Sequence, residues 1–157
     1  MFKLFKKIEG KTAEEWFDLG YKEKDPEKQI EYYSKCLKLD PKNADAWNNI
    51  GIAFDDLGRY EEAIRCFDKA LEIHPEYANA WCNKGFALAE LGRYQNWRYE
   101  EALRCFEKAI EIDPEYEEAK NGKKLAEEKL REQKRKEEME RKKALNCLLY
   151  TSPSPRD

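Results

Sequence analysis

One pattern of residues occurs twice in the chain, and this repeat constrains the fold more than any other feature. Trp47 and the run 57–60 (Leu-Gly-Arg-Tyr) return 34 residues later as Trp81 and the run 91–94. Beyond that point matching resumes at an offset of 39, because the second copy contains five extra residues. A period of this length is typical of an array of like units that stack on one another.

The residues at fixed places in the two copies resemble the tetratricopeptide repeat, a helix–turn–helix unit of about 34 residues. The family pattern reads Trp, Leu-Gly and Tyr in the first helix, Ala and Phe in the second, and a closing Pro. Most of its positions are filled twice, by 47–54 (WNNIGIAF), 63–67 (AIRCF) and Pro75, and by 81–88 (WCNKGFAL), 102–106 (ALRCF) and Pro114. The departures are Ile50 and Lys84 in place of Leu, and Phe54 and Leu88 in place of Tyr. The resemblance implies an all-α, right-handed superhelix of about three hairpins with a long C-terminal capping helix.

This resemblance divides the chain into segments. We expect a basic N-terminal segment (1–12), three repeats (13–43, 44–77 and 78–116), a capping helix (117–130), a charged helical extension (131–146) and a tail (147–157). The first repeat is degenerate, but Thr12 and Glu15 predict a capping box and Asp25-Pro26 predicts a second helix start. The tail, CLLYTSPSPRD, resembles a translated sequencing adapter, so we interpret it as non-native; a disordered Ser/Pro tail is the alternative.

Small and aromatic residues recur at equivalent places of the two clear repeats. Gly51 and Gly85 fall inside first helices, where Gly costs about 1 kcal/mol relative to Ala. We therefore expect another backbone to come close at both positions. Phe67 and Phe106 of the second helices are expected to fill the space that remains between stacked hairpins.

Charge and hydropathy limit the classes of function. The net charge of −3 is the sum of +3 over residues 1–11, −9 over 12–130 and +3 over 131–143. An acidic middle excludes a nucleic-acid-binding face on the folded part. No apolar run approaches the roughly 20 residues that cross a bilayer, so we expect a cytoplasmic protein. Attachment to a membrane surface through residues 2–8 (FKLFKKI) is the alternative, although capping of the first repeat is favoured.

Groups that carry catalysis or bind metals are sparse. The cysteines have no metal-ligand spacing and are expected to be small buried hydrophobes; they are Cys36, Cys66, Cys82, Cys105 and Cys147. His74 stands in a turn where the other copies have Asp40 and Asp113, which indicates a polar cap. We therefore expect no catalytic residue, no metal, no cofactor and no enzymatic activity.

The resemblance also implies a concave groove, lined by the first helices, that holds a peptide or a helix of a partner protein. Carried over by position, its residues are Phe17, Tyr21, Asp45, Asn48, Asn49, Ile52, Asp56, Asn79, Asn83, Phe86 and Glu90. Amide side chains suit such a groove because each can both donate to and accept from a peptide backbone; ordinary exposed polar residues are the alternative. The acidic members have no nearby Lys or Arg, which favours neutral or basic peptides.

One subset of the family binds the acidic C-terminal carboxylate of heat-shock chaperones through a cluster of Lys and Arg. This chain keeps Asn49 of that pattern. The other four positions carry Phe17, Tyr21, Asn79 and Asn83 in place of Lys, Asn, Lys and Arg. This departure disfavours a co-chaperone role.

The five extra residues fall at the turn of the third hairpin, within 92–102 (GRYQNWRYEEA). They can form a longer loop or prolong a helix by about one turn of 3.6 residues. We favour helix extension for part of the insertion, because no Pro or Gly follows Gly92 there. Since one Tyr suffices for the place of Tyr60, Tyr94 and Trp97 form a possible rim site for a partner, with local packing as the alternative.

Overall fold

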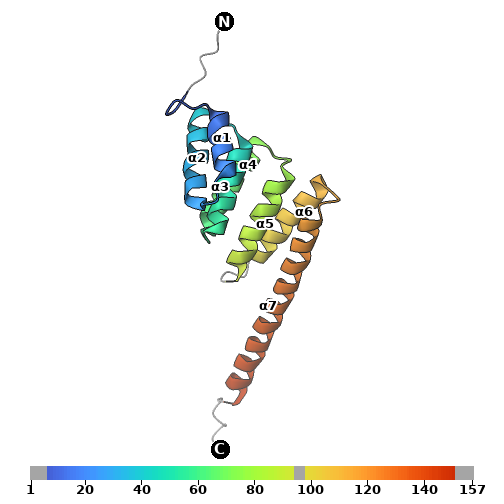
Figure 1. The fold of residues 1–157 in the computed structure, drawn as a ribbon. Coiled ribbons are helices and arrows are strands. Elements are labelled where there is room, and N and C mark those ends of the chain that lie inside the picture. Colours follow the sequence, from blue (N-terminus) through green and yellow to red (C-terminus); the bar gives the residue numbers. More distant parts are fainter. Residues whose placement is uncertain (1–6, 94–97, 151–157) are drawn as a thin grey trace, which may run out of the picture.

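The computed structural model describes residues 7–93 and 98–150 and contains seven α-helices, with no named strand in those ranges. The helices are α1 (Ala13–Lys22), α2 (Pro26–Leu39), α3 (Ala44–Asp56), α4 (Tyr60–Ile73), α5 (Ala78–Gly92), α6 (Arg98–Ile112) and α7 (Glu117–Tyr150). Figure 1 shows them in chain order as antiparallel hairpins that stack along one axis, with α7 extending beyond the stack. The predicted all-α repeat architecture is confirmed.

The stack is curved, with one layer of helices inside and one outside. The hairpins are α1–α2, α3–α4 and α5–α6, and each packs on the next through α2 with α3, α4 with α5, and α6 with α7. Along the inner layer α3 also contacts α5, and α5 contacts α7. The helices α2, α4 and α6 make no comparable contacts with one another. The odd-numbered helices therefore line the concave face, as the superhelix requires.

Side-chain caps fix where α1 and α2 begin. Glu15 N donates to Thr12 Oγ1 at 3.3 Å and Thr12 N donates to Glu15 Oε2 at 2.7 Å, which is the predicted capping box. Asp25 caps α2 by accepting from Glu27 N at 3.1 Å. His74 ends α4, and its N–H donates to the Ala70 carbonyl at 2.8 Å. The predicted starts of α1 and α2 are confirmed, and His74 is the C-cap residue of α4, where it bonds through its backbone.

Aromatic rings of the second helices close the core of each hairpin. The side chains of Phe67 and Phe106 are 1% and 0% exposed. A Cβ atom added at Gly51 would lie 2.4 Å from Phe67 Cε1, and one at Gly85 would lie 2.7 Å from Phe106 Cε1. The expectation of a close backbone at these glycines is therefore wrong. The group that needs the space is a ring from the same hairpin.

Phe106 also ties the last hairpin to the capping helix. A Cβ atom at Gly122 of α7 would lie 2.5 Å from the Phe106 ring, so this glycine lets α7 approach α6. Ala119 and Ala126 are buried in the same cluster. The first part of α7, through Ala126, therefore completes the core of the stack.

The repeated Leu-Gly-Arg-Tyr phrase adopts two different conformations. Gly58 has φ +71°, and the next N–H, that of Arg59, donates to the Phe54 carbonyl at 2.8 Å, which ends α3. Gly92 is instead the last residue of α5, which has 15 residues where α3 has 13. Residues 94–97 of the insertion lie outside the described residues, so the extension of a helix into the insertion stays a prediction.

A tyrosine of α6 covers the prolonged end of α5. Tyr99 follows Tyr60 by 39 residues, is 6% exposed, and packs so closely that a Cβ atom at Gly92 would lie 2.8 Å from its ring. Tyr99 therefore occupies the place that Tyr60 holds one repeat earlier. Tyr94 and Trp97 lie outside the described residues, and the rim site stays a prediction.

The described part of the N-terminal segment folds back on the first repeat. Trp16 Nε1 donates to the Ile8 carbonyl at 3.0 Å, and Ile8 pairs with Lys11. Lys35 forms an ion pair with Glu9 at 3.1 Å and lies 4.4 Å from the centre of the Trp16 ring. These contacts favour the capping interpretation over membrane attachment; Phe2 and Phe5 lie outside the described residues. Within 7–93 and 98–150, no helix combines the length and apolarity that a bilayer crossing requires.

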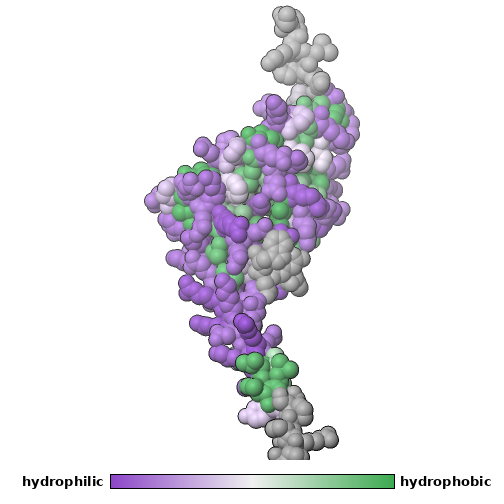
Figure 2. All heavy atoms as spheres, turned by 180° about the vertical axis from the view of Figure 1, so that it is seen from behind, coloured by the Kyte–Doolittle hydropathy of each residue, from purple (hydrophilic) through white to green (hydrophobic). Residues whose placement is uncertain are grey.

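The outer half of α7 is exposed and charged. Glu127 pairs with Arg131 at 3.7 Å and Glu132 pairs with Lys136 at 2.8 Å, each with the acid four residues before the base. Each such pair stabilises a helix by about 0.2–0.5 kcal/mol. Figure 2 shows a largely hydrophilic surface with an apolar patch at the end of α7, where Leu145, Leu148 and Leu149 are exposed. Part of this patch falls in the segment that we interpret as non-native.

Candidate functional site

The inner face carries a hollow between the first two hairpins. It has a volume of about 190 Å³ and is lined by Tyr21, Gln29, Tyr33, Asn49 and Ile52. Tyr21 is 75% exposed and Ile52 is 38% exposed, which is unusual for large apolar side chains in a packed repeat. Three of the predicted groove residues, from α1 and α3, are thus brought together.

Two further lining residues come from a second helix and were missed by the sequence comparison. Tyr33 stands 34 residues before Phe67, so the repeat places its ring in the core, where it is 3% exposed. Its hydroxyl lies at the hollow and accepts a hydrogen bond from Asn49 Nδ2 at 3.2 Å. Burial raises the pKa of Tyr33, so the hydroxyl stays protonated. The bond fixes the orientation of the Asn49 amide at the hollow.

Asn48 does not face the groove, although the sequence comparison placed it there. Its side chain is 4% exposed, and its Oδ1 accepts a hydrogen bond from Asn83 Nδ2 at 3.1 Å. This bond joins α3 to α5 and satisfies a buried amide oxygen. Asn48 therefore positions Asn83 and offers no surface of its own.

The two predicted phenylalanines lie half-buried and support the floor of the groove. Phe17 packs edge-on against Tyr33 with ring centres 5.3 Å apart. Phe86 packs in the same way against Phe106 at 5.0 Å. Such pairs contribute about 0.5–1.5 kcal/mol beyond their buried area, so their first task is packing.

The acidic groove positions differ in their surroundings. Asp45 is exposed and accepts a hydrogen bond from the Tyr77 hydroxyl at 2.5 Å. Glu90 forms an ion pair with Arg93 at 3.1 Å. The expectation that these acids have no nearby Lys or Arg is wrong for Glu90, because the prolonged end of α5 brings Arg93 onto the same face. Asp56 and Asn79 are exposed.

Asp55, next to the groove, is an acid that the sequence comparison did not place among the groove residues. One oxygen of its carboxylate, Oδ1, is buried and has no hydrogen-bond partner. Burial is the main cause that raises the pKa of Asp55 to about 6, and the nearby charges of Asp56 and Glu90 add to it. A negative charge on this carboxylate therefore lowers the stability of the folded state at neutral pH.

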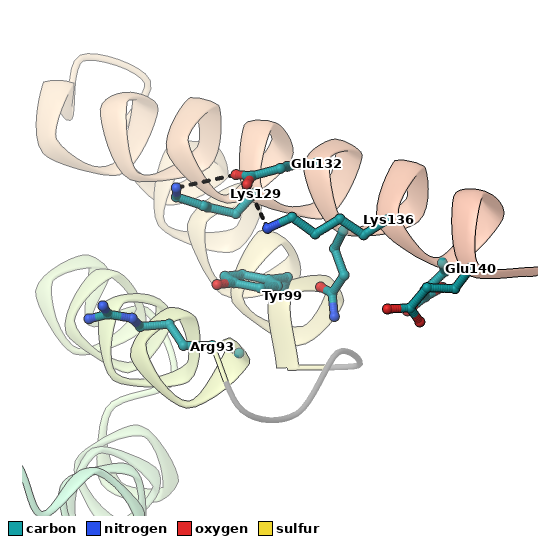
Figure 3. A pocket seen from close by; sticks show the side chains of 9 residues that line it. Arg93, Tyr99, Lys129, Glu132, Lys136 and Glu140 are labelled. Carbon is teal, nitrogen blue, oxygen red and sulfur yellow. Dashed lines mark ion pairs between the residues drawn. The ribbon is translucent and has the colours of Figure 1, made fainter. Parts of the chain in front are cut away.

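A second hollow, of about 400 Å³, lies where the end of α5 meets α7 (Figure 3). Tyr99 lies beside the side chains of α7, among them Glu132, which pairs with Lys129 at 3.5 Å and with Lys136 at 2.8 Å. Gln133 also lines this hollow, and its Oε1 is buried without a partner. Sequence comparison missed this region because it depends on the continuation of α7 past its capping turns.

Chemistry-bearing clusters are sparse on the described residues. In the ranges 7–93 and 98–150, no group of three or more His, Cys, Asp or Glu side chains is arranged to hold a metal ion. Four cysteines are buried, as predicted: Cys36, Cys66, Cys82 and Cys105. Cys147 is exposed, so the expectation of burial is wrong for it. Burial raises the pKa of each of these thiols to about 11.

A buried thiol with a raised pKa reacts slowly, because the thiolate is the nucleophile. We therefore expect a maleimide at pH 7 to modify Cys147 quickly in the folded chain and to modify the four buried cysteines only after unfolding in urea. Mass spectrometry of peptides from the two samples measures this. Rapid modification of Cys36 or Cys82 in the folded chain would contradict the packing described above.

Comparison with known families agrees with this geometry. Models of the tetratricopeptide repeat match residues 18–43, 44–77, 66–96 and 95–116. An uncharacterized protein of Methanocaldococcus jannaschii is 42% identical over 59 residues, which make up 36% of this chain and 69% of that protein.

Solved structures share the same arrangement of helices. The TPR domain of Arabidopsis OM64 superposes with a TM-score of 0.66 at 29% identity, covering 73% of this chain and 93% of that domain. The first TPR domain of Spaghetti (RPAP3), bound to the HSP90 peptide SRMEEVD, gives a TM-score of 0.67 at 24% identity and covers 75% and 92% of the two chains. MamA gives 0.68 at 23% identity, with 92% and 79% covered.

Proposed function

Because this chain belongs to the tetratricopeptide repeat family, we propose that it is a non-catalytic scaffold that binds a peptide or helix of a partner protein in its concave groove. The observation that carries the proposal is the hollow between α1 and α3, where exposed Tyr21 and Ile52 flank the oriented amide of Asn49. Apolar anchors beside a fixed hydrogen-bonding group are what a peptide ligand needs.

The charge of the groove indicates which peptides suit it. Asp45 and Asp56 are exposed on the inner face, and Glu90 is balanced by Arg93. An acidic tail such as SRMEEVD, the ligand in the RPAP3 structure, would bring carboxylates close to these acids. We therefore propose a neutral or basic partner segment, because unlike charges favour association and like charges oppose it.

Two synthetic peptides with the same Leu and Phe anchors, one rich in Lys and one rich in Glu, test this proposal. The side-chain amide signal of Asn49, followed by NMR, reports binding in the groove. We expect the Lys-rich peptide to bind there at least about tenfold more tightly, a difference of about 1.4 kcal/mol. The reason is that the basic peptide gains attraction to Asp45 and Asp56, whereas the acidic peptide is repelled.

Matched variants locate the site. Ile52→Lys should weaken binding of the Lys-rich peptide strongly, because it places a charge at the apolar anchor. Ile73→Lys is the control, since Ile73 is equally exposed, at 37%, but lies at the end of α4 outside the groove. Equal loss in both variants, or tighter binding of the Glu-rich peptide at the Asn49 signal, would show that the proposed groove is wrong.

A further inference from the structure

The outer side of the stack carries a hollow of about 370 Å³ on the third hairpin. Its floor is apolar and comes from Trp81 and Leu88 of α5 and Cys105 of α6. The groove residues of α5, such as Asn83, stand on the opposite side of that helix. Lys84 marks the outer side, because it forms an ion pair with Asp68 of α4 at 2.6 Å. This surface is separate from the concave groove.

The floor is rigid as well as apolar. Trp81 Nε1 donates to the Pro75 carbonyl at 2.8 Å, which fixes the indole ring. Leu88 is 1% exposed and Cys105 is 5% exposed, so both are held by the core beneath. A ligand side chain that enters the hollow therefore meets a preformed apolar surface, and little ordering of the protein opposes binding.

The rim of this hollow is basic. Three cations line it, Lys84, Arg104 and Lys108, against one acid, Glu101. Glu101 is paired with Arg98 at 3.0 Å, Lys84 with Asp68 at 2.6 Å and Lys108 with Glu111 at 2.9 Å. Within the described ranges, Arg104 has no ion pair, so its guanidinium is available. A planar guanidinium binds a carboxylate through two parallel hydrogen bonds.

The preceding hairpin carries an equivalent hollow that serves as an internal comparison. Trp47, Phe54 and Cys66 form its floor, and Arg65 and Lys69 stand at the places of Arg104 and Lys108. Its lining also contains three acids, namely Glu62, Asp68 and Glu72. The two hollows share a Trp and Cys floor, but cations outnumber acids in the lining of the first and acids outnumber cations in the lining of the second. Glu111, at the place of Glu72, lies outside the lining of the first hollow and pairs with Lys108.

We propose that the basic outer hollow on α5 and α6 is a second docking site, which takes an acidic segment of a partner protein. One large apolar side chain of that segment packs on Trp81 and Leu88, and a neighbouring carboxylate pairs with Arg104. Lys108 stands beside Arg104 at the rim, where it is paired with Glu111 at 2.9 Å. The site goes beyond the proposed groove, because it lies on the opposite face and selects the opposite charge. A chain with both sites can hold two different partner segments at once.

Titration of the full chain with the Glu-rich peptide described above tests the second site. The indole N–H signals of Trp81 and Trp47 report the two outer hollows separately. We expect a saturable shift of the Trp81 signal and a much smaller shift of the Trp47 signal. Arg104→Glu combined with Lys108→Glu should weaken binding at least about tenfold. The matched control, Arg65→Glu with Lys69→Glu, should leave it within about twofold.

The outcomes that overturn the proposal are distinct. Equal shifts of Trp81 and Trp47, or unchanged affinity in the Arg104 and Lys108 variant, would mean that this hollow does not select acidic segments. Loss of Glu-rich peptide binding in Ile52→Lys would place the acidic ligand in the concave groove instead. Arg104→Gln keeps a polar side chain and should give an intermediate loss, which guards against an effect of charge reversal on folding. Failure of the Lys-rich peptide at Asn49 bears on the groove alone.

Discussion

Phe106→Ala is expected to lower the free energy of unfolding by about 3–5 kcal/mol, and Phe67→Ala by a similar amount. Each ring is almost completely buried and fills the space that a glycine of the facing helix leaves open. The surrounding helices cannot close the resulting cavity without shifting the register of the stack. Phe106 contacts glycines on both α5 and α7, so its loss weakens two interfaces at once. Urea denaturation followed by circular dichroism measures the change.

Leu125→Ala is the matched control for the phenylalanine variants. Leu125 also lies on the stack, in α7, but is 50% exposed, so truncation should cost well under half of the value for Phe106. Small domains commonly have a total stability of about 5–15 kcal/mol, so the loss expected for Phe106→Ala is a large share of it. Phe106→Leu provides a milder variant if Phe106→Ala fails to fold. Unchanged midpoints for both Phe67→Ala and Phe106→Ala would mean that the repeat register is wrong.

The fold could be predicted because the contacts in a repeat array are between hairpins that are neighbours along the chain. Each hairpin contacts only its neighbours, so the spacing of small and aromatic residues along the chain states which helix faces meet. Capping residues such as Thr12 and Asp25 act within one turn and are therefore readable locally. The identity of the group opposite Gly51 was not readable. A small residue indicates that some group comes close, but a neighbouring backbone and an aromatic ring both require a small residue at this position. The sequence therefore does not tell which of the two is present.

The groove was only partly predictable, for physical reasons that particular residues illustrate. Asn48 and Asn49 are adjacent on α3, and a rotation of the helix by a fraction of a turn decides which amide is buried between helices. Tyr33 differs from Phe67 by one hydroxyl, and that atom reaches the inner face. The same four residues, Leu-Gly-Arg-Tyr, follow the end of α3, where Gly58 has a positive φ, whereas α5 continues through Gly92. There the residues that follow decide the conformation.

Asp55→Asn is expected to stabilise the chain at pH 7 by about 1–3 kcal/mol, from a pKa raised by roughly two units. The ordinary pKa of 3.8 applies to the unfolded chain, and the pKa of about 6 applies to the folded one. Between these values the folded state binds more protons, so stability falls as pH rises. The penalty is absent below about pH 3.8 and complete above about pH 6. Denaturation of both proteins from pH 3.5 to 8 measures their difference.

Comparison of the two proteins at each pH is necessary because other carboxyls shift in the opposite direction. Glu15 and Glu62, for example, have lowered pKa values from hydrogen bonds to Thr12 and Arg59, and their protonation destabilises the fold below about pH 4.5 in both proteins. Asp56→Asn separates the causes at Asp55. If burial is the main cause of the raised pKa, Asp56→Asn should retain most of the pH-dependent loss of stability that the Asp55 charge produces. If repulsion from Asp56 is the main cause, Asp56→Asn should remove most of that loss. A difference between wild type and Asp55→Asn that is constant from pH 3.5 to 8 would mean that the Asp55 carboxylate reaches water.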